Sequence, residues 1–160
     1  MRVPFDTVVS RHGSTILAVC RAVVGPNDAE DVWSETFLAA LRAYPALPED
    51  ANVEAWLVTI AKRKGIDALR AGARRPDPVA EVPDRLDDAV HHGVRDDDLV
   101  AALAALTPRQ REVIAYHVLV GLPYAEVAEI VGGTAVAARR AAADGLARLR
   151  STYPLEARHG

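Results

Sequence analysis

The stretch TPRQREVIAYHVLVGLPYAEVAEIVGGTAVAARRAAADGLARLR, residues 107–150, decides the fold. It opens with a strong helix-start signal, because Thr107 can cap a helix whose first residue is Pro108 and whose third is Gln110. The apolar residues that follow recur at helical spacing. We therefore expect this helix to continue as far as Gly121.

Two further helices are expected in the same stretch. A short helix covers about residues 123–131, and Gly132-Gly133 then makes a tight turn. Thr134 can cap a last helix that continues to about Arg150. A short helix, a glycine turn and a longer helix form the helix-turn-helix pattern, which is typical of DNA-binding domains.

The apolar residues of the first 75 positions also recur at helical spacing, and they predict three helices. The first helix ends at Gly25-Pro26, the second begins at Asn27 with Glu30 in a variant of the capping box, and Asn52 caps the third. The apolar stripes are Phe5, Val9, Ile16, Cys20 and Val24; Trp33, Phe37, Ala40, Leu41 and Tyr44; and Val53, Trp56, Leu57 and Ile60.

The whole chain has a net charge of −3, and its acidic residues are concentrated in the middle. Residues 76–98 carry 2 basic and 8 acidic side chains, whereas residues 1–75 carry 10 and 9, and residues 99–160 carry 7 and 5. The middle segment also holds three prolines and no apolar period, so we predict a flexible acidic linker. The expected fold is all-α, with two small helical domains at 1–75 and 99–160 joined by this linker.

The composition disfavours several classes of protein. No run of about 18 apolar residues predicts a membrane span, and no basic segment before an apolar run predicts a secretory signal, so we expect a cytoplasmic protein without membrane insertion. Cys20 is the only cysteine, which excludes an internal disulfide and favours a buried apolar role. The five histidines lack metal-ligand spacing, and no phosphate-binding loop or nucleophile elbow occurs. We therefore expect no metal, no cofactor and no enzymatic activity.

Acidic residues line one face of the second expected helix. Asp28, Asp31 and Glu35 are spaced by three and four residues, lie opposite the stripe of Trp33, and end beside Leu38, which we expect to be exposed. A charged face of this kind is usually only solvated, and the alternative is a docking face for a basic partner helix. The spacing does not choose between the two.

Basic residues line the end of the third expected helix. Arg63, Arg70 and Arg74 are seven and four residues apart and share a face, with Lys62 beside it, which makes a track for phosphates. Asp67 lies within this track and offsets part of its charge.

The last expected helix presents Arg139 and Arg140 away from its buried stripe, toward a major groove if DNA is bound. Thr134 at the helix start can bond a phosphate together with free backbone amides. Asp144 follows Arg140 by four residues, which is the spacing of an ion pair on a helix.

These segments resemble the extracytoplasmic-function group of bacterial sigma factors. Residues 28–38, DAEDVWSETFL, are similar to the region 2 segment that binds the clamp helices of RNA polymerase. Residues 55–70, AWLVTIAKRKGIDALR, are similar to the promoter-melting helix. Residues 106–113, LTPRQREV, and 121–132, GLPYAEVAEIVG, are similar to region 4. Both sets in this order, joined by a short acidic linker, make the resemblance specific.

The resemblance implies a transcription initiation factor with core RNA polymerase, promoter DNA and an anti-sigma protein as partners. The residues that it assigns to core polymerase are Asp28, Asp31, Glu35 and Leu38. The loop 48–54 and the basic helix after it would contact the melted minus-ten element through Asn52, Lys62, Arg63, Arg70 and Arg74. The residues that it assigns to the minus-thirty-five duplex are Arg109, Arg111, Thr134, Arg139 and Arg140.

The recognition helix departs from the family pattern, because alanines replace several polar residues between positions 133 and 145, and Asp144 stands where an Arg is common. Two other hypotheses therefore stay open. A stand-alone helix-turn-helix regulator would use only the C-terminal domain, and a sigma-like adaptor would bind polymerase or an inhibitor without promoter recognition. Co-purification with core polymerase separates the regulator from the other two, and run-off transcription separates the adaptor from a sigma factor.

Overall fold

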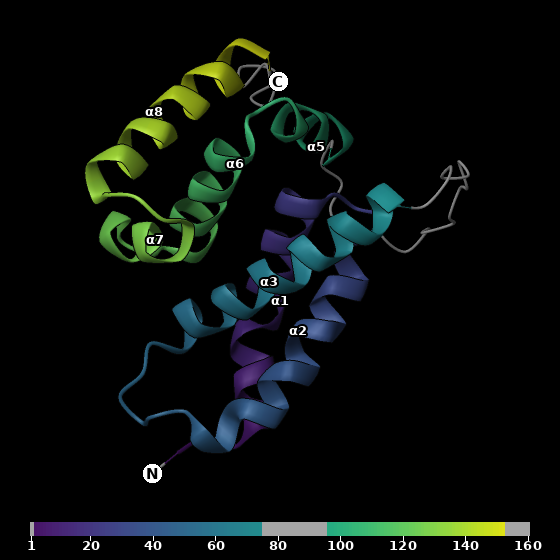
Figure 1. The fold of residues 1–160 in the computed structure, drawn as a ribbon, viewed down its shortest axis with the longest axis vertical. Coiled ribbons are helices and arrows are strands. Elements are labelled where there is room, and N and C mark those ends of the chain that lie inside the picture. The colour runs from purple at the N-terminus through teal and green to yellow at the C-terminus, as the bar shows by residue number, and fades with distance from the viewer. Residues whose placement is uncertain (1, 75–95, 153–160) are drawn as a thin grey trace, which may run out of the picture.

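The computed structural model describes residues 2–74 and 96–152, which form helices joined by short turns (Figure 1). The first block consists of α1 (Phe5–Val24), α2 (Ala29–Ala43), the 3-10 turn η1 (Tyr44–Ala46) and α3 (Val53–Arg74). The second block consists of α5 (Asp96–Ala104), α6 (Pro108–Ile114), the π-helical segment η2 (Ala115–Val120), α7 (Tyr124–Val131) and α8 (Ala135–Thr152). No strand occurs in these two stretches, and the expected all-α fold is confirmed.

The first block is a three-helix bundle, and its core comes largely from the predicted apolar stripes. Ile16 is 1% exposed, and Leu57 and Val58 are completely buried. Leu41 is 51% exposed, however, so its assignment to the buried stripe of the second helix is wrong. Leu41 follows the buried Ala40 by one residue, and one residue turns an α-helix by about 100°, which carries Leu41 to the solvent side.

The turn between α1 and α2 differs in detail from the sequence prediction. Gly25, with a φ of 90°, ends α1 as expected. The predicted cap at Asn27 is wrong, because Asp28 is the N-cap residue and α2 begins at Ala29. Asp28 has nearly helical angles (φ −100°, ψ −6°) and makes no side-chain cap bond. A capping side chain needs an extended backbone to reach the free amides, and this turn does not supply it.

The start of α6 is the capping box that the sequence predicts. The Gln110 amide donates to Thr107 Oγ1 at 3.1 Å, and the Thr107 amide donates to Gln110 Oε1 at 3.2 Å. The helix ends at Gly121, in the left-handed region with a φ of 89°, also as predicted. Its last part, Ala115–Val120, is π-helical, a feature that the apolar spacing does not indicate.

The helix-turn-helix unit is formed by α7 and α8, and Gly132 and Gly133 make the turn with φ values of 95° and 92°. Thr134 caps α8, because its Oγ1 accepts the Ala137 amide at 3.0 Å. A Cβ at Gly145 would lie 2.6 Å from Ile114 Cδ1, so α8 crosses α6 at a distance that favours glycine.

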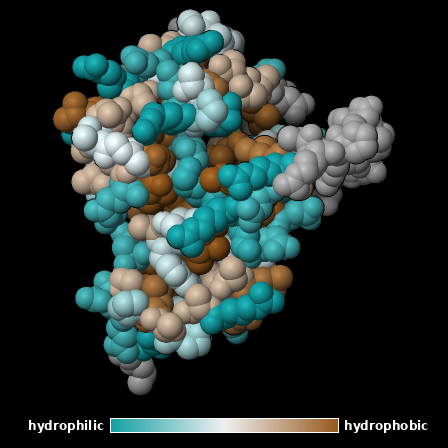
Figure 2. Space-filling view, viewed as in Figure 1, coloured by the Kyte–Doolittle hydropathy of each residue, from teal (hydrophilic) through white to brown (hydrophobic). Residues whose placement is uncertain are grey.

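The two blocks pack against each other along α1, which contacts α5, α6 and η2 (Figure 1). Tyr116 of η2 is 1% exposed and lines a small cavity together with Cys20 and Lys62 of the first block. On the face shown in Figure 2, hydrophobic residues gather near the junction of the two blocks, and hydrophilic residues cover much of the surrounding surface. Buried apolar residues of both blocks therefore form one connected core.

The predicted linker falls mostly on residues 75–95, outside the described part of the chain. The helix α5 begins at Asp96, three residues before the expected start of the second domain at residue 99. Along the stretches 2–74 and 96–152, none of the helices combines the length and the hydrophobicity that a bilayer span requires.

The capping box gives a test of local stability. Thr107→Ala removes the acceptor of the Gln110 amide, so we expect the free energy of unfolding to fall by about 1 kcal/mol. Thr107→Ser keeps a hydroxyl at the cap and should stay close to the wild type. Urea unfolding of the full chain, followed by circular dichroism, measures both variants. Equal stabilities of the alanine and serine variants would contradict this role of the cap.

Candidate polymerase and promoter interface

The acidic residues of α2 lie on the surface. Asp31 and Glu35 are exposed, and neither forms an ion pair with the rest of the described chain. Asp28 is half-buried at the helix start. Leu38 is 50% exposed, as predicted, and Leu41 adds a second exposed leucine that the sequence analysis missed. Two exposed leucines thus lie next to the charged face, so both charge and apolar area are available to a docking partner.

The loop before α3 is held by Asn52, which contacts both blocks. Its Oδ1 accepts the Ala55 amide at 3.1 Å and so caps α3, as the sequence predicts. Its Nδ2 donates to the carboxylate of Glu126 in α7, at 3.0 Å to Oε1 and 3.3 Å to Oε2. A side chain assigned to the minus-ten element by resemblance therefore has a carboxylate of the second block as its partner.

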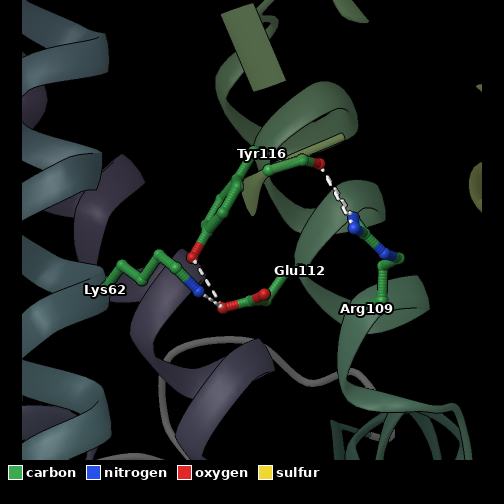
Figure 3. A network of polar contacts seen from close by, with 5 residues as sticks. Lys62, Arg109, Glu112 and Tyr116 are labelled. Atoms are coloured by element: carbon green, nitrogen blue, oxygen red, sulfur yellow. Dashed lines mark hydrogen bonds and ion pairs between the residues drawn. The ribbon is translucent and has the colours of Figure 1, made fainter. Parts of the chain in front are cut away.

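Lys62 of α3 forms the central polar contact between the blocks (Figure 3). Its Nζ lies 2.7 Å from Glu112 Oε2 of α6, and the two side chains are 23% and 16% exposed. The Tyr116 hydroxyl donates to the same carboxylate oxygen at 3.4 Å. Burial, followed by the charge of Glu112, raises the pKa of Tyr116. The tyrosine therefore stays a neutral donor, and one carboxylate oxygen of Glu112 accepts from both the Lys62 ammonium and the Tyr116 hydroxyl.

The other basic residues of the predicted track are Arg63, Arg70 and Arg74, and neither Arg63 nor Arg70 forms an ion pair within the described residues. Arg63 and Arg70 are exposed, and so is Asp67 between them. The side chain of Arg74 lies outside the described part of the structure, although α3 extends to this residue. The basic track is therefore open along Arg63 and Arg70, whereas its neighbour Lys62 is occupied.

Two arginines near the start of α6 bond to backbone carbonyls. The Arg109 guanidinium donates to the carbonyl of Gly132, the C-cap residue of α7, at 3.1 and 3.2 Å. The Arg111 guanidinium donates to the Leu103, Ala104 and Leu106 carbonyls at 3.0, 3.2 and 2.8 Å. Arg111 thus binds carbonyls at the end of α5 and in the turn that follows it. Arg109 is exposed and Arg111 is half-buried.

Arg139 and Arg140 of the recognition helix α8 have different surroundings. Arg140 is exposed and lines a cleft with Arg109, Thr134 and Asp144. The expected Arg140–Asp144 ion pair is not among those formed by the described residues, so this prediction is wrong. Arg139 instead lies over the ring of Tyr124 at the start of α7, with 5.2 Å between its Cζ and the ring centroid.

The partners of these residues could not be found from local sequence patterns. Glu112 and Glu126 look like ordinary solvated carboxylates, and only the fold brings them to Lys62 and Asn52. No group of three or more His, Cys, Asp or Glu side chains suited to a metal ion occurs within residues 2–74 and 96–152.

The described residues thus form a three-helix block with an exposed acidic face and a basic helix, packed against a helix-turn-helix block. The family description "Sigma-70 region 2" matches residues 8–75, and "Sigma-70, region 4" matches residues 96–149. The chain belongs to the sigma-70 family of RNA polymerase sigma factors, in its extracytoplasmic-function group.

The chain is similar to known sigma factors in sequence and in fold. The chain is 34% identical over 110 residues to the sigma factor SigC of Mycobacterium tuberculosis, covering 66% of this chain and 60% of SigC. It is 33% identical over 152 residues to the sigma factor ShbA of Streptomyces griseus, and the match covers 84% of this chain and 80% of ShbA. The sigma factor RpoE of Bartonella quintana, in complex with the anti-sigma factor NepR, superposes with a TM-score of 0.76 at 21% identity, covering 92% of this chain and 95% of that one.

Cys20 offers a native probe of the contact between the blocks. It is 2% exposed, and burial raises the pKa of its thiol to about 12. Glu112→Lys places two cations in the Lys62 contact and should open it. We expect the reaction of Cys20 with a disulfide reagent at pH 8 to accelerate at least about tenfold, which corresponds to about 1.4 kcal/mol.

The matched control is the charge swap Lys62→Glu with Glu112→Lys, which restores an attractive pair in the opposite sense. Its Cys20 should react nearly as slowly as that of the wild type. If Glu112→Lys alone leaves the rate unchanged, the ion pair does not hold the two blocks together.

Proposed function

We propose that this chain is an alternative sigma factor, a non-enzymatic protein that binds core RNA polymerase in the cytoplasm and directs promoter-specific initiation. The observation that carries the proposal is the combination, on one chain, of an exposed acidic face on α2 and a helix-turn-helix unit with exposed arginines on α8. A stand-alone regulator has no use for the first feature.

Core polymerase binds to α2 in this proposal. Asp28, Asp31 and Glu35 supply charge for basic residues of the partner, and Leu38 supplies apolar area next to them. Desolvation at the centre of such an interface strengthens the charge pairs, and the exposed leucine excludes water from them.

The melted minus-ten strand binds at the start of α3 and along its basic side. The residues involved are Asn52, Lys62, Arg63, Arg70 and Arg74. In the packed arrangement, Asn52 and Lys62 bind Glu126 and Glu112. DNA phosphates must therefore compete with these carboxylates, and the second block must move away from α3 for full contact. An exchange of one anionic partner for another keeps the Lys62 ammonium paired, so the charge is not left buried and alone.

The minus-thirty-five duplex binds at α8, through Thr134, Arg139 and Arg140. Arg109 and Arg111 hold phosphates beside it. Their bonds to backbone carbonyls do not preclude this role, since a guanidinium has five N–H donors. Arg109 is the better placed of the two, because it is exposed and shares the cleft with Arg140.

An anti-sigma protein is the further partner in this proposal. The Bartonella quintana protein of the same fold is in complex with one. A chain whose α2 face and α3 contacts both serve polymerase and DNA is inhibited by any protein that covers either of them.

The acidic face gives the first test of this function. Changing Asp31 and Glu35 together to Lys reverses the charge that faces polymerase, and loss of one partner of such a pair costs about 2–5 kcal/mol. We expect core polymerase no longer to be pulled down by the double variant. The matched control changes Asp67 and Glu129, which are exposed on α3 and α7, to Lys. It makes the same charge change elsewhere and should retain binding. Equal pull-down by both double variants would sink the α2 assignment.

Promoter dependence gives the second test. Each phosphate contact adds only about one unit to the salt slope, so the few contacts of α8 should bind duplex weakly in the free protein. Within the polymerase complex, α8 is tethered beside its site at roughly millimolar effective concentration, and weak contacts suffice. We expect run-off transcription from promoters selected from a randomised library only when core polymerase is present.

Arg139→Ala with Arg140→Ala should abolish this transcription, whereas Arg148→Ala with Arg150→Ala, at the far end of α8, should not. Tight sequence-specific binding by the free protein would instead indicate a stand-alone regulator. Polymerase binding without transcription from any selected promoter would indicate an adaptor.

A further inference from the structure

Three side chains from three consecutive elements of the second block stack on one another. The rings of His117 in η2 and Tyr124 in α7 are nearly parallel, 17° apart, with 3.9 Å between their centroids. The Arg139 guanidinium of α8 lies over the same Tyr124 ring at 5.2 Å. A ring spacing of 3.9 Å leaves no room for a third group between the rings, which leaves the other face of Tyr124 to Arg139.

The base of this stack is fixed to the backbone. His117 Nδ1 lies 2.8 Å from the Leu122 carbonyl, and because a carbonyl only accepts, Nδ1 is the donor. Leu122 is 2% exposed, and its amide donates to the Tyr116 carbonyl at 3.2 Å. The His117 ring is therefore held by the buried turn between η2 and α7, and Tyr124 stacks on a ring whose position is fixed by this hydrogen bond.

The stack distinguishes Arg139 from its neighbour. Arg140 lines an open cleft, and within the described residues it has neither an aromatic partner nor an ion pair. The recognition helix is rich in alanine, so few side chains are available to contact DNA. A side chain that is ordered before binding loses less conformational entropy on binding, so one ordered arginine contributes more than one mobile arginine.

We infer that Tyr124 is a positioning residue for DNA recognition, because it holds the Arg139 guanidinium in place on α8 before DNA arrives. This inference rests on the proposed function of α8. A stacked guanidinium uses its face for the ring, and its N–H donors stay free at the edge to bind two acceptors on the duplex. Those acceptors belong either to a base edge or to a phosphate, and both present the same chemistry to Arg139.

The matched pair of variants is Tyr124→Phe, which keeps the ring, and Tyr124→Leu, which keeps apolar bulk without a π face. The probe is a pool of duplex DNA randomised over the upstream promoter element, bound by the full chain with core polymerase. Loss of a cation–π contact at an exposed site corresponds to a factor of about two to five. We expect Tyr124→Leu to weaken binding of the selected duplex by this factor and Tyr124→Phe to match the wild type.

The salt dependence separates the two kinds of acceptor. If Arg139 binds a base edge, Tyr124→Leu relaxes selectivity at one position. If it binds a phosphate, Tyr124→Leu weakens all sequences alike, and Arg139→Ala lowers the salt slope by about one.

A second measurement reports the position of Arg139 without DNA. Relaxation of the Arg139 Nε–H by nuclear magnetic resonance, assigned with Arg139→Lys, should show a more rigid side chain than Arg140 in the wild type. The difference in rigidity between Arg139 and Arg140 should remain in Tyr124→Phe and disappear in Tyr124→Leu. If Tyr124→Leu fails to fold, the wild-type comparison of Arg139 with Arg140 still decides the point.

Equal mobility of Arg139 and Arg140 in the wild type would overturn the inference. So would equal DNA binding by Tyr124→Leu and Tyr124→Phe. If Arg139→Ala weakens DNA binding and Tyr124→Leu does not, the positioning role alone fails. If Arg139→Ala together with Arg140→Ala leaves transcription unchanged, the proposed role of α8 fails, and the positioning role fails with it.

Discussion

Burial of the Tyr116 ring against α1 is the contact on which the arrangement of the molecule depends. Each block is small, and small domains bury too little surface to be very stable on their own. The η2 segment adds Tyr116 to the core of the first block, beside Cys20. Once that ring is in place, Glu112 lies one helical turn away from it and faces Lys62. The polar contacts between the blocks thus follow from an apolar one.

Local signals in the sequence were sufficient for most helix boundaries. Thr107, Asn52 and Thr134 cap their helices as predicted, because a cap depends on residues three positions away. Gly25 and Gly121 end helices for the same local reason. Errors appeared where two local effects compete. Asn27 has the chemistry of a cap but precedes a turn that already has nearly helical angles, and Leu41 fits the apolar count but lies on the wrong side of α2.

The candidate sites were predicted as positions, and their partners were not. Lys62 and Glu112 are 50 residues apart in sequence, and Asn52 and Glu126 are 74 apart. No periodicity links residues at such separations, so their pairing is determined only by the packing of the blocks. The same holds for Arg139. The sequence places it outside the buried stripe of α8, whereas the ring beneath it comes from another helix.

The π-helical segment Ala115–Val120 also has an evolutionary consequence. A π-turn accommodates one residue more than the α-helix around it, as if a single residue had been inserted into α6. Residues before it pack on α8 and on α1, and residues within it pack mainly on α1. Deletion of one residue would restore ordinary helical phase and turn everything downstream by about 100° relative to α6. The length of this segment is therefore constrained during evolution, in addition to the identity of Tyr116 within it.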